Sequence, residues 1–131
     1  MIRMYLIFSH KLTEEQKSEI CSDLGCADVV SLPGNLQNIW SNVNSAADDI
    51  LSAANDIIQW LYENTREKDY LLVEGDFGMT FMIVDWALSN ERIPVYSTTE
   101  RRYSSRGRSD GSVTNIHHFR HIKFRRYSRF V

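Results

Sequence analysis

Three short polar segments follow apolar runs in the sequence, and their side chains are of types that bind phosphate. Ser9-His10 follows the first run, Gly75-Asp76-Phe77-Gly78 follows a later one, and residues 97–102 (STTERR) follow the last. The carboxyl ends of parallel strands meet at one edge of a sheet, where ligands bind. The sequence therefore predicts one phosphate-binding site that all three segments share.

The GDFG segment contains the three letters with which protein kinases hold a catalytic magnesium ion. A chain of 131 residues holds none of the other kinase parts. The segment lies between apolar runs at 70–73 and 79–88, which predicts a strand-to-helix corner whose backbone N–H groups bind phosphate. We expect Asp76 to be a helix N-cap, a ligand contact or both, while Phe77 either stacks on a base or fills the core.

The remaining polar residues of the three segments offer proton transfer and phosphate binding. His10 is either a general acid or base or a positioning residue, since imidazole titrates near neutral pH. Thr98 and Thr99 can hydrogen-bond phosphate or ribose hydroxyls. Arg101 and Arg102 are the stronger phosphate ligands, because a guanidinium fork matches phosphate oxygens.

Histidines and cysteines elsewhere give a weak case for a metal. His117 and His121 share one face of a strand while His118 lies on the other, so we expect charge or hydrogen bonds to phosphate from them and no metal site. Cys21 and Cys26 lack the paired spacing and partner histidines of a zinc site. Both are predicted to be packing residues.

The charges are divided unevenly along the chain. Residues 1–91 carry five Lys or Arg and fifteen Asp or Glu, a net charge of −10. Residues 92–131 carry ten Lys or Arg and two Asp or Glu, a net charge of +8. A basic module of this kind favours a phosphate-bearing partner. The alternatives are a solvated hairpin, or one neutralised by the acidic half of a neighbouring subunit.

The elements that position these residues alternate between strand and helix, which predicts an α/β fold with a Rossmann-like, three-layer parallel sheet. We expect a single domain over 1–131, with a core at 1–97 and a basic antiparallel hairpin at 98–131 that turns at Ser109-Asp110-Gly111-Ser112. A capping box at Thr13 and Gln16 begins the first helix. Strands are expected at 2–8, 27–32, 70–74 and 93–97, and further helices at 47–61 and 79–88.

The chain is expected to be soluble and cytoplasmic. Its apolar windows are interrupted every few residues by Asp, Asn or Lys, and its start, MIRMYLIFSHKL, is typical of a buried strand. A charged leader with a cleavage site is not predicted.

Five segments in this order resemble one known family. MYLIFSHKLTEEQ, LPGNLQNIWSNV, YLLVEGDFGMTF, IPVYSTTERR and HFRHIKFRRY are similar to the small stand-alone CRISPR-associated proteins of the Csx class, over residues 4–127. The resemblance implies a fold related to the CARF sensor domains of type III CRISPR systems. It also implies a homodimer that binds cyclic oligoadenylate, in particular cyclic tetra-adenylate, at the subunit interface, and no membrane or DNA partner.

Several of these relatives are ring nucleases, so the resemblance implies a reaction as well. A ribose 2′-OH attacks the neighbouring phosphate and leaves a 2′,3′-cyclic phosphate, without a metal or a cofactor. Ser9, Thr99 and Arg101 would hold the scissile phosphate and His10 would move a proton. The implied ligand contacts are Trp40, Asn42, Asp76, Phe77, Gly78, Thr80, Thr98, Glu100 and Arg102, with core packing as the alternative for Trp40.

Three other functions remain open from the sequence. A non-catalytic sensor or sponge for the same ligand would have the same basic edge. The aromatic residues among the hairpin arginines could bind single-stranded RNA by stacking and charge. Alternatively, the basic hairpin only docks on the acidic half of a second subunit.

Overall fold

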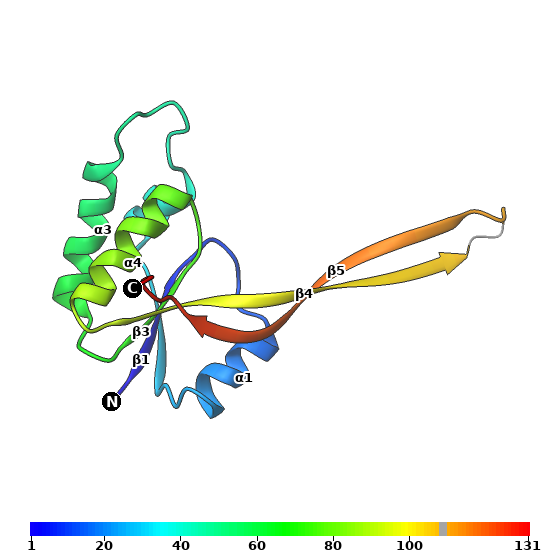
Figure 1. Ribbon diagram of the computed structural model, residues 1–131, viewed down its shortest axis with the longest axis horizontal. Coiled ribbons are helices and arrows are strands. Elements are labelled where there is room, and N and C mark those ends of the chain that lie inside the picture. Colours follow the sequence, from blue (N-terminus) through cyan, green and yellow to red (C-terminus); the bar gives the residue numbers. More distant parts are fainter. Residues whose placement is uncertain (108–109) are drawn as a thin grey trace.

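A sheet with the strand order β2-β1-β3-β4-β5 forms the centre of the computed structural model (Figure 1). The structure describes residues 1–107 and 110–131, and their side chains except those of 102–106 and 113–118. Within this part, strands β1 to β4 run parallel and β5 runs antiparallel to β4. An α/β fold with a mostly parallel sheet is therefore confirmed. The strands are β1 (Arg3–Ile7), β2 (Asp28–Ser31), β3 (Tyr70–Val73), β4 (Ile93–Gly107) and β5 (Val113–Arg126).

Helices pack on both faces of this sheet because successive strand residues point to opposite sides. Met4 packs in one buried cluster with Ile20, whereas Tyr5 packs in another with Ile57 and Ile83. Helix α1 thus covers one face, and α3 and α4 lie together on the other (Figure 1). Among the described residues, no helix has the length and apolarity needed to cross a bilayer. The helices are α1 (Glu14–Ser22), α2 (Gly34–Ser41), α3 (Leu51–Asn64) and α4 (Phe77–Ser89).

The helix starts depend on side chains that bond to backbone N–H groups. The capping box predicted at the start of α1 is confirmed, with Thr13 and Gln16 bonding reciprocally. Helix α3 begins later than the predicted residue 47. Asn44 and Asp49 accept hydrogen bonds from backbone N–H groups two residues ahead, and such local bonds compete with helix formation.

The two cysteines differ in environment. Cys26 is buried in the α1 side of the core, and burial raises the pKa of its thiol to about 11. Cys21 is exposed on the outer face of α1. The prediction of a packing residue is confirmed for Cys26 and wrong for Cys21.

The C-terminal hairpin is a continuation of the sheet. Strand β4 does not end near residue 97 but runs on to Gly107, because β5 pairs with it along this whole length. Past the body the two strands form a long arm (Figure 1). At its turn Gly111 has a φ of +86° and Asp110 Oδ1 accepts the Ser112 N–H, while Ser109 lies outside the described residues.

Candidate functional site at the carboxyl edge of the sheet

The carboxyl ends of β1, β3 and β4 lie side by side. Ile7 is in register with Val73, and the Glu74 N–H donates to the Ile7 carbonyl at 3.1 Å. The Ser97 N–H donates to Glu74 Oε1 at 2.6 Å, which ties β4 to the end of β3. The three polar segments therefore begin at the same edge of the sheet.

Ser9 and His10 are both exposed at the end of β1. Ser9 Oγ lies 2.9 Å from Ser41 Oγ at the end of α2. Gln37 fixes this pair, because its Nε2 donates to both the Phe8 carbonyl and Ser41 Oγ. Sequence reasoning missed Gln37 and Ser41, since it left 35–40 as a loop or short helix.

Trp40 is a core residue that supports the GDFG corner from inside. Its side chain is buried and its Nε1–H donates to the Glu74 carbonyl at 3.1 Å. A Cβ on Gly75 would lie 2.6 Å from the indole ring, so the backbone passes directly over it. The expected adenine contact of Trp40 is therefore corrected to core packing. Asn42 is exposed, and its Nδ2 donates to the carbonyl and side-chain oxygens of Asn38.

Asp76 is the N-cap of α4, as predicted. Its Oδ2 accepts the Met79 N–H at 3.0 Å, so a phosphate here would meet the N–H groups of Phe77 and Gly78. Phe77 is 94% exposed, which rules out the predicted alternative of core packing. In the described part of the chain, the Thr80 hydroxyl is buried without a hydrogen-bond partner.

Thr98 lies at a break in the pairing of β4 with β5. Register shifts between Thr98 and Thr99, which leaves Ile122 as an extra residue on β5. Thr98 Oγ1 donates to the Lys123 carbonyl at 3.0 Å and lies 3.2 Å from the Lys123 N–H. The Thr98 hydroxyl thus bonds to the β5 backbone at the bulge, where the regular pairing of β4 with β5 is interrupted.

The next residues of β4 lie at the root of the arm. Thr99, Glu100 and Arg101 are exposed, and the Arg101 guanidinium lies 5.2 Å from the ring centre of Phe119. The side chain of Arg102 lies outside the described part, as do those of His117 and His118. The predicted phosphate ligands Thr99 and Arg101 are therefore accessible beside the sheet edge.

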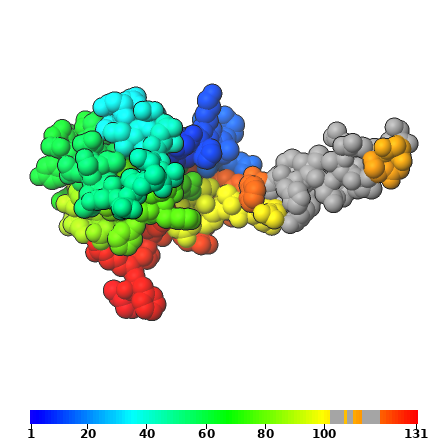
Figure 2. Space-filling model, turned by 90° about the horizontal axis from the view of Figure 1, so that it is seen from above, coloured from blue at the N-terminus to red at the C-terminus, as the bar shows by residue number. Residues whose placement is uncertain are grey.

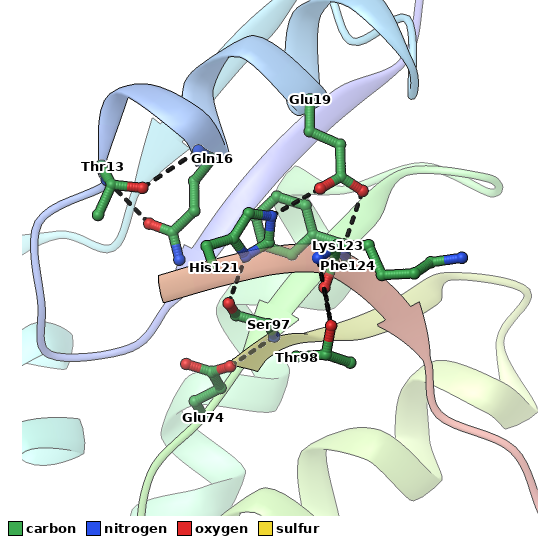
Figure 3. Close-up of polar contacts among 9 residues, drawn as sticks. All are labelled: Thr13, Gln16, Glu19, Glu74, Ser97, Thr98, His121, Lys123 and Phe124. Atoms are coloured by element: carbon green, nitrogen blue, oxygen red, sulfur yellow. Dashed lines mark hydrogen bonds and ion pairs between the residues drawn. The ribbon is translucent and has the colours of Figure 1, made fainter. Parts of the chain in front are cut away.

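A buried polar chain links this edge to α1 (Figure 3). Ser97 Oγ lies 2.5 Å from His121 Nδ1, and His121 Nε2 lies 2.6 Å from Glu19 Oε1. The other oxygen, Glu19 Oε2, accepts the Phe124 N–H at 2.8 Å. Sequence reasoning did not assemble this chain, although a glutamate on the helix face that buries Ile20 was a signal.

The bulge explains why His121 points inward. In a regular strand His121 and Phe124 would lie on opposite faces. The extra residue brings both to the α1 side, where their ring centres are 4.6 Å apart.

An apolar groove lies between α4 and the C-terminal residues 127–130, close to the corner. The C-terminal residues, red in Figure 2, project from the body beside the yellow-green region that contains α4. Arg129 holds this segment to α4 through a 2.8 Å contact with Asp85. The apolar side chains along the groove are Phe77, Phe81, Val84, Leu88, Tyr127 and Phe130.

Fold and site together define an α/β protein with a mixed sheet, whose carboxyl edge presents polar and aromatic side chains beside a basic arm. The chain belongs to the family described as "Uncharacterized protein MJ1673 family", whose model matches residues 2–125. It is 37% identical over 130 residues to "Uncharacterized protein MJ1673" of Methanocaldococcus jannaschii, which covers 99% of this chain and 100% of that protein. No solved structure matches the chain.

Proposed function

We propose that the chain is a ring nuclease of the CRISPR-associated Csx class, with a CARF-like Rossmann fold, that acts in the cytoplasm. Its substrate is cyclic tetra-adenylate, and cleavage switches off type III CRISPR signalling. A substrate 2′-oxygen forms a bond to the adjacent phosphorus and the bond from phosphorus to the 5′-oxygen breaks. The products carry a 2′,3′-cyclic phosphate and a 5′-hydroxyl.

The observation that carries this proposal is the convergence of three strand ends at one sheet edge. Ser9, the capped corner at Asp76 and the segment from Ser97 to Arg101 all begin there, and ligands of parallel sheets bind at this edge. Such a site cleaves a phosphodiester by positioning the attack and stabilising the charged phosphorane. Thr99 and Arg101 supply that stabilisation, and His10 donates the proton to the leaving oxygen.

Aromatic exposure supports an adenine-containing ligand. Phe77 projects beside the α4 N-terminus with 94% of its surface exposed. A base that stacks on such a ring gains about 1–3 kcal/mol. We assign Phe77 to an adenine of the ring.

A homodimer fits the proposed ligand. A cyclic tetranucleotide has two-fold symmetry, and two copies of the chain related by a two-fold axis present the same edge twice. The +8 charge of residues 92–131 favours such a tetra-anion over an uncharged metabolite.

The test is incubation of the purified chain with cyclic tetra-adenylate in EDTA, with chromatography of the products. Cyclic hexa-adenylate and linear tetra-adenylate are run beside it. We expect linear products that end in 2′,3′-cyclic phosphate, with cleavage strongly reduced in Arg101→Ala. Arg3→Ala is the matched control, because Arg3 lies at the opposite end of β1. An intact ring after tight binding would identify a sensor or sponge instead.

Single-stranded RNA binding by the arm is the second candidate. Phe119 is 66% exposed and carries Arg101 over its ring, an arrangement that also suits stacked bases. Salt-sensitive binding of linear oligonucleotides, indifferent to cyclisation, would favour this function.

A further inference from the structure

We propose that Ser97, His121 and Glu19 form the proton relay that activates the attacking 2′-hydroxyl, an inference that rests on the proposed ring cleavage. Ser97 is the residue that touches the substrate. His121 receives the proton through Ser97, and Glu19 positions the imidazole.

The hydrogen bonds define the direction of the relay. An ionised glutamate only accepts hydrogen bonds, and both oxygens of Glu19 are used, one by His121 Nε2 and one by the Phe124 N–H. In the neutral imidazole, Nε2 then carries the proton and Nδ1 presents its lone pair to Ser97 Oγ at 2.5 Å. This is the hydroxyl-imidazole-carboxylate order of a general-base relay.

Burial shields the relay from water. Only 4% of the His121 side chain and 12% of the Glu19 side chain are exposed, whereas Ser97 is half-buried. An imidazole and a carboxylate so enclosed lose hydration, and their electrostatic interaction is stronger than in water. Among the described residues, the buried His121 therefore lies between Glu19 and Ser97, and Ser97 is the partner at the sheet edge.

Ser97 also lies where the proposed reaction needs a base. Its N–H is bonded to Glu74 at the end of β3, and Thr99 and Arg101 follow it on the same strand. The charged groups around the relay are Glu19 from α1, Glu74 from the end of β3, and two cations of β5. Of these cations, Arg120 pairs with Glu15 at 3.7 Å and Lys123 is exposed.

The step conserves atoms and protons. The substrate 2′-hydroxyl gives its proton to Ser97 Oγ as Ser97 gives its own to His121 Nδ1, which leaves an imidazolium paired with Glu19. The 2′-oxygen bonds to phosphorus, and the 5′-oxygen leaves and takes a proton from His10. Proton return from His121 to solvent and uptake by His10 restore the enzyme.

The experiment measures single-turnover cleavage of cyclic tetra-adenylate, its affinity and the unfolding midpoint for each variant. Ser97→Ala removes one oxygen, and Glu19→Gln replaces one acceptor by a donor, which selects the wrong imidazole tautomer. We expect each to slow cleavage by about 100-fold or more, the usual contribution of general-base catalysis, with affinity within about threefold of wild type. Glu15→Gln, on the same helix and paired only at the surface, should cleave normally.

A third variant separates catalysis from structure. His121→Asn keeps a side chain that can hydrogen-bond but has no imidazole to accept the proton, so it should slow cleavage as much as Ser97→Ala while affinity and the unfolding midpoint stay near wild type. Relay variants that cleave at wild-type rates would overturn the relay alone. A nucleotide of the substrate linked through phosphate to Ser97 Oγ, found by mass spectrometry, would also overturn it, because Ser97 would then be the nucleophile. A wild-type chain that never cleaves the ring would overturn the proposed function, and the relay with it.

Discussion

At the scale of single residues, position 75 requires glycine because the Trp40 side chain lies against it, and not because of an unusual backbone conformation. The Trp40 ring occupies the space that a Cβ would need, at 2.6 Å from Cζ2. Gly75→Ala must therefore displace a buried indole, and overpacking of this kind costs about 1–3 kcal/mol. Urea unfolding should show this loss, whereas Gly34→Ala, which meets no atom within 4 Å, should unfold like wild type.

Phe77 tests the ligand site without disturbing the core. Because its ring is exposed, Phe77→Ala should change the free energy of unfolding by less than about 0.5 kcal/mol. Loss of a stacked adenine should weaken cyclic tetra-adenylate binding by about tenfold. Calorimetric titration measures this, with Tyr62→Ala as an exposed aromatic control on α3. Unchanged affinity would remove Phe77 from the site.

Tyr127 gives a pH-dependent prediction. Its hydroxyl donates to the Val73 carbonyl at 2.6 Å, and burial, with a smaller effect of Glu74, raises its pKa to about 12 from 10.0. The folded state favours the neutral phenol. The contribution of Tyr127 to the free energy of unfolding is therefore complete below pH 10 and is lost as the pH rises through 12.

Tyr127→Phe should therefore cost about 1 kcal/mol at pH 8 through the lost hydrogen bond. The difference from wild type should shrink between pH 10 and 12. Denaturant unfolding at these pH values provides the measurement, and a difference that grows with pH would contradict the assignment.

At the scale of elements, helix starts follow from local chemistry. Asp76 accepts the Met79 N–H, and the loss of such a cap costs about 1 kcal/mol. Asp76→Ala should lower stability by this amount, while Asp76→Asn keeps the acceptor and should lose little. Equal losses in thermal unfolding would mean that the charge, not the hydrogen bond, stabilises α4.

Both caps could be predicted because N-caps depend on a few consecutive residues, as Thr13 and Asp76 show. The extent of β4 could not, since its residues past 97 are strand only where β5 pairs with them. Similarly, the sequence did not decide whether the residues before Trp40 form a loop or a helix. In the structure they form α2, and Trp40 is buried in the core.

At the scale of the molecule, the hydrophobic core of the body does not include the described side chains of the arm beyond Phe124. The buried apolar residues of both clusters come from residues 4–95 and from Phe124, within the described side chains. A variant in which Asn-Gly joins Arg101 to Phe119, which are in register, should keep the unfolding midpoint within a few degrees.

The same variant should bind cyclic tetra-adenylate more weakly, because it lacks Arg102, Arg106 and Arg108. Its log affinity should also depend less steeply on salt concentration. Binding titrations at two salt concentrations measure both effects. An unfolding midpoint far below that of wild type would show that the body needs the arm in order to fold stably.

The sequence by itself determined the α/β class, the corner at Asp76 and the polar segments that follow the strands. These depend on hydrophobic period and on bonds between near neighbours. Only the tertiary structure decided that Trp40 is buried, that Phe77 is exposed, and that Ser97, His121 and Glu19 meet. The last contact spans 102 residues and needs a bulge that reverses the inward face of β5, and no local pattern specifies such a bulge.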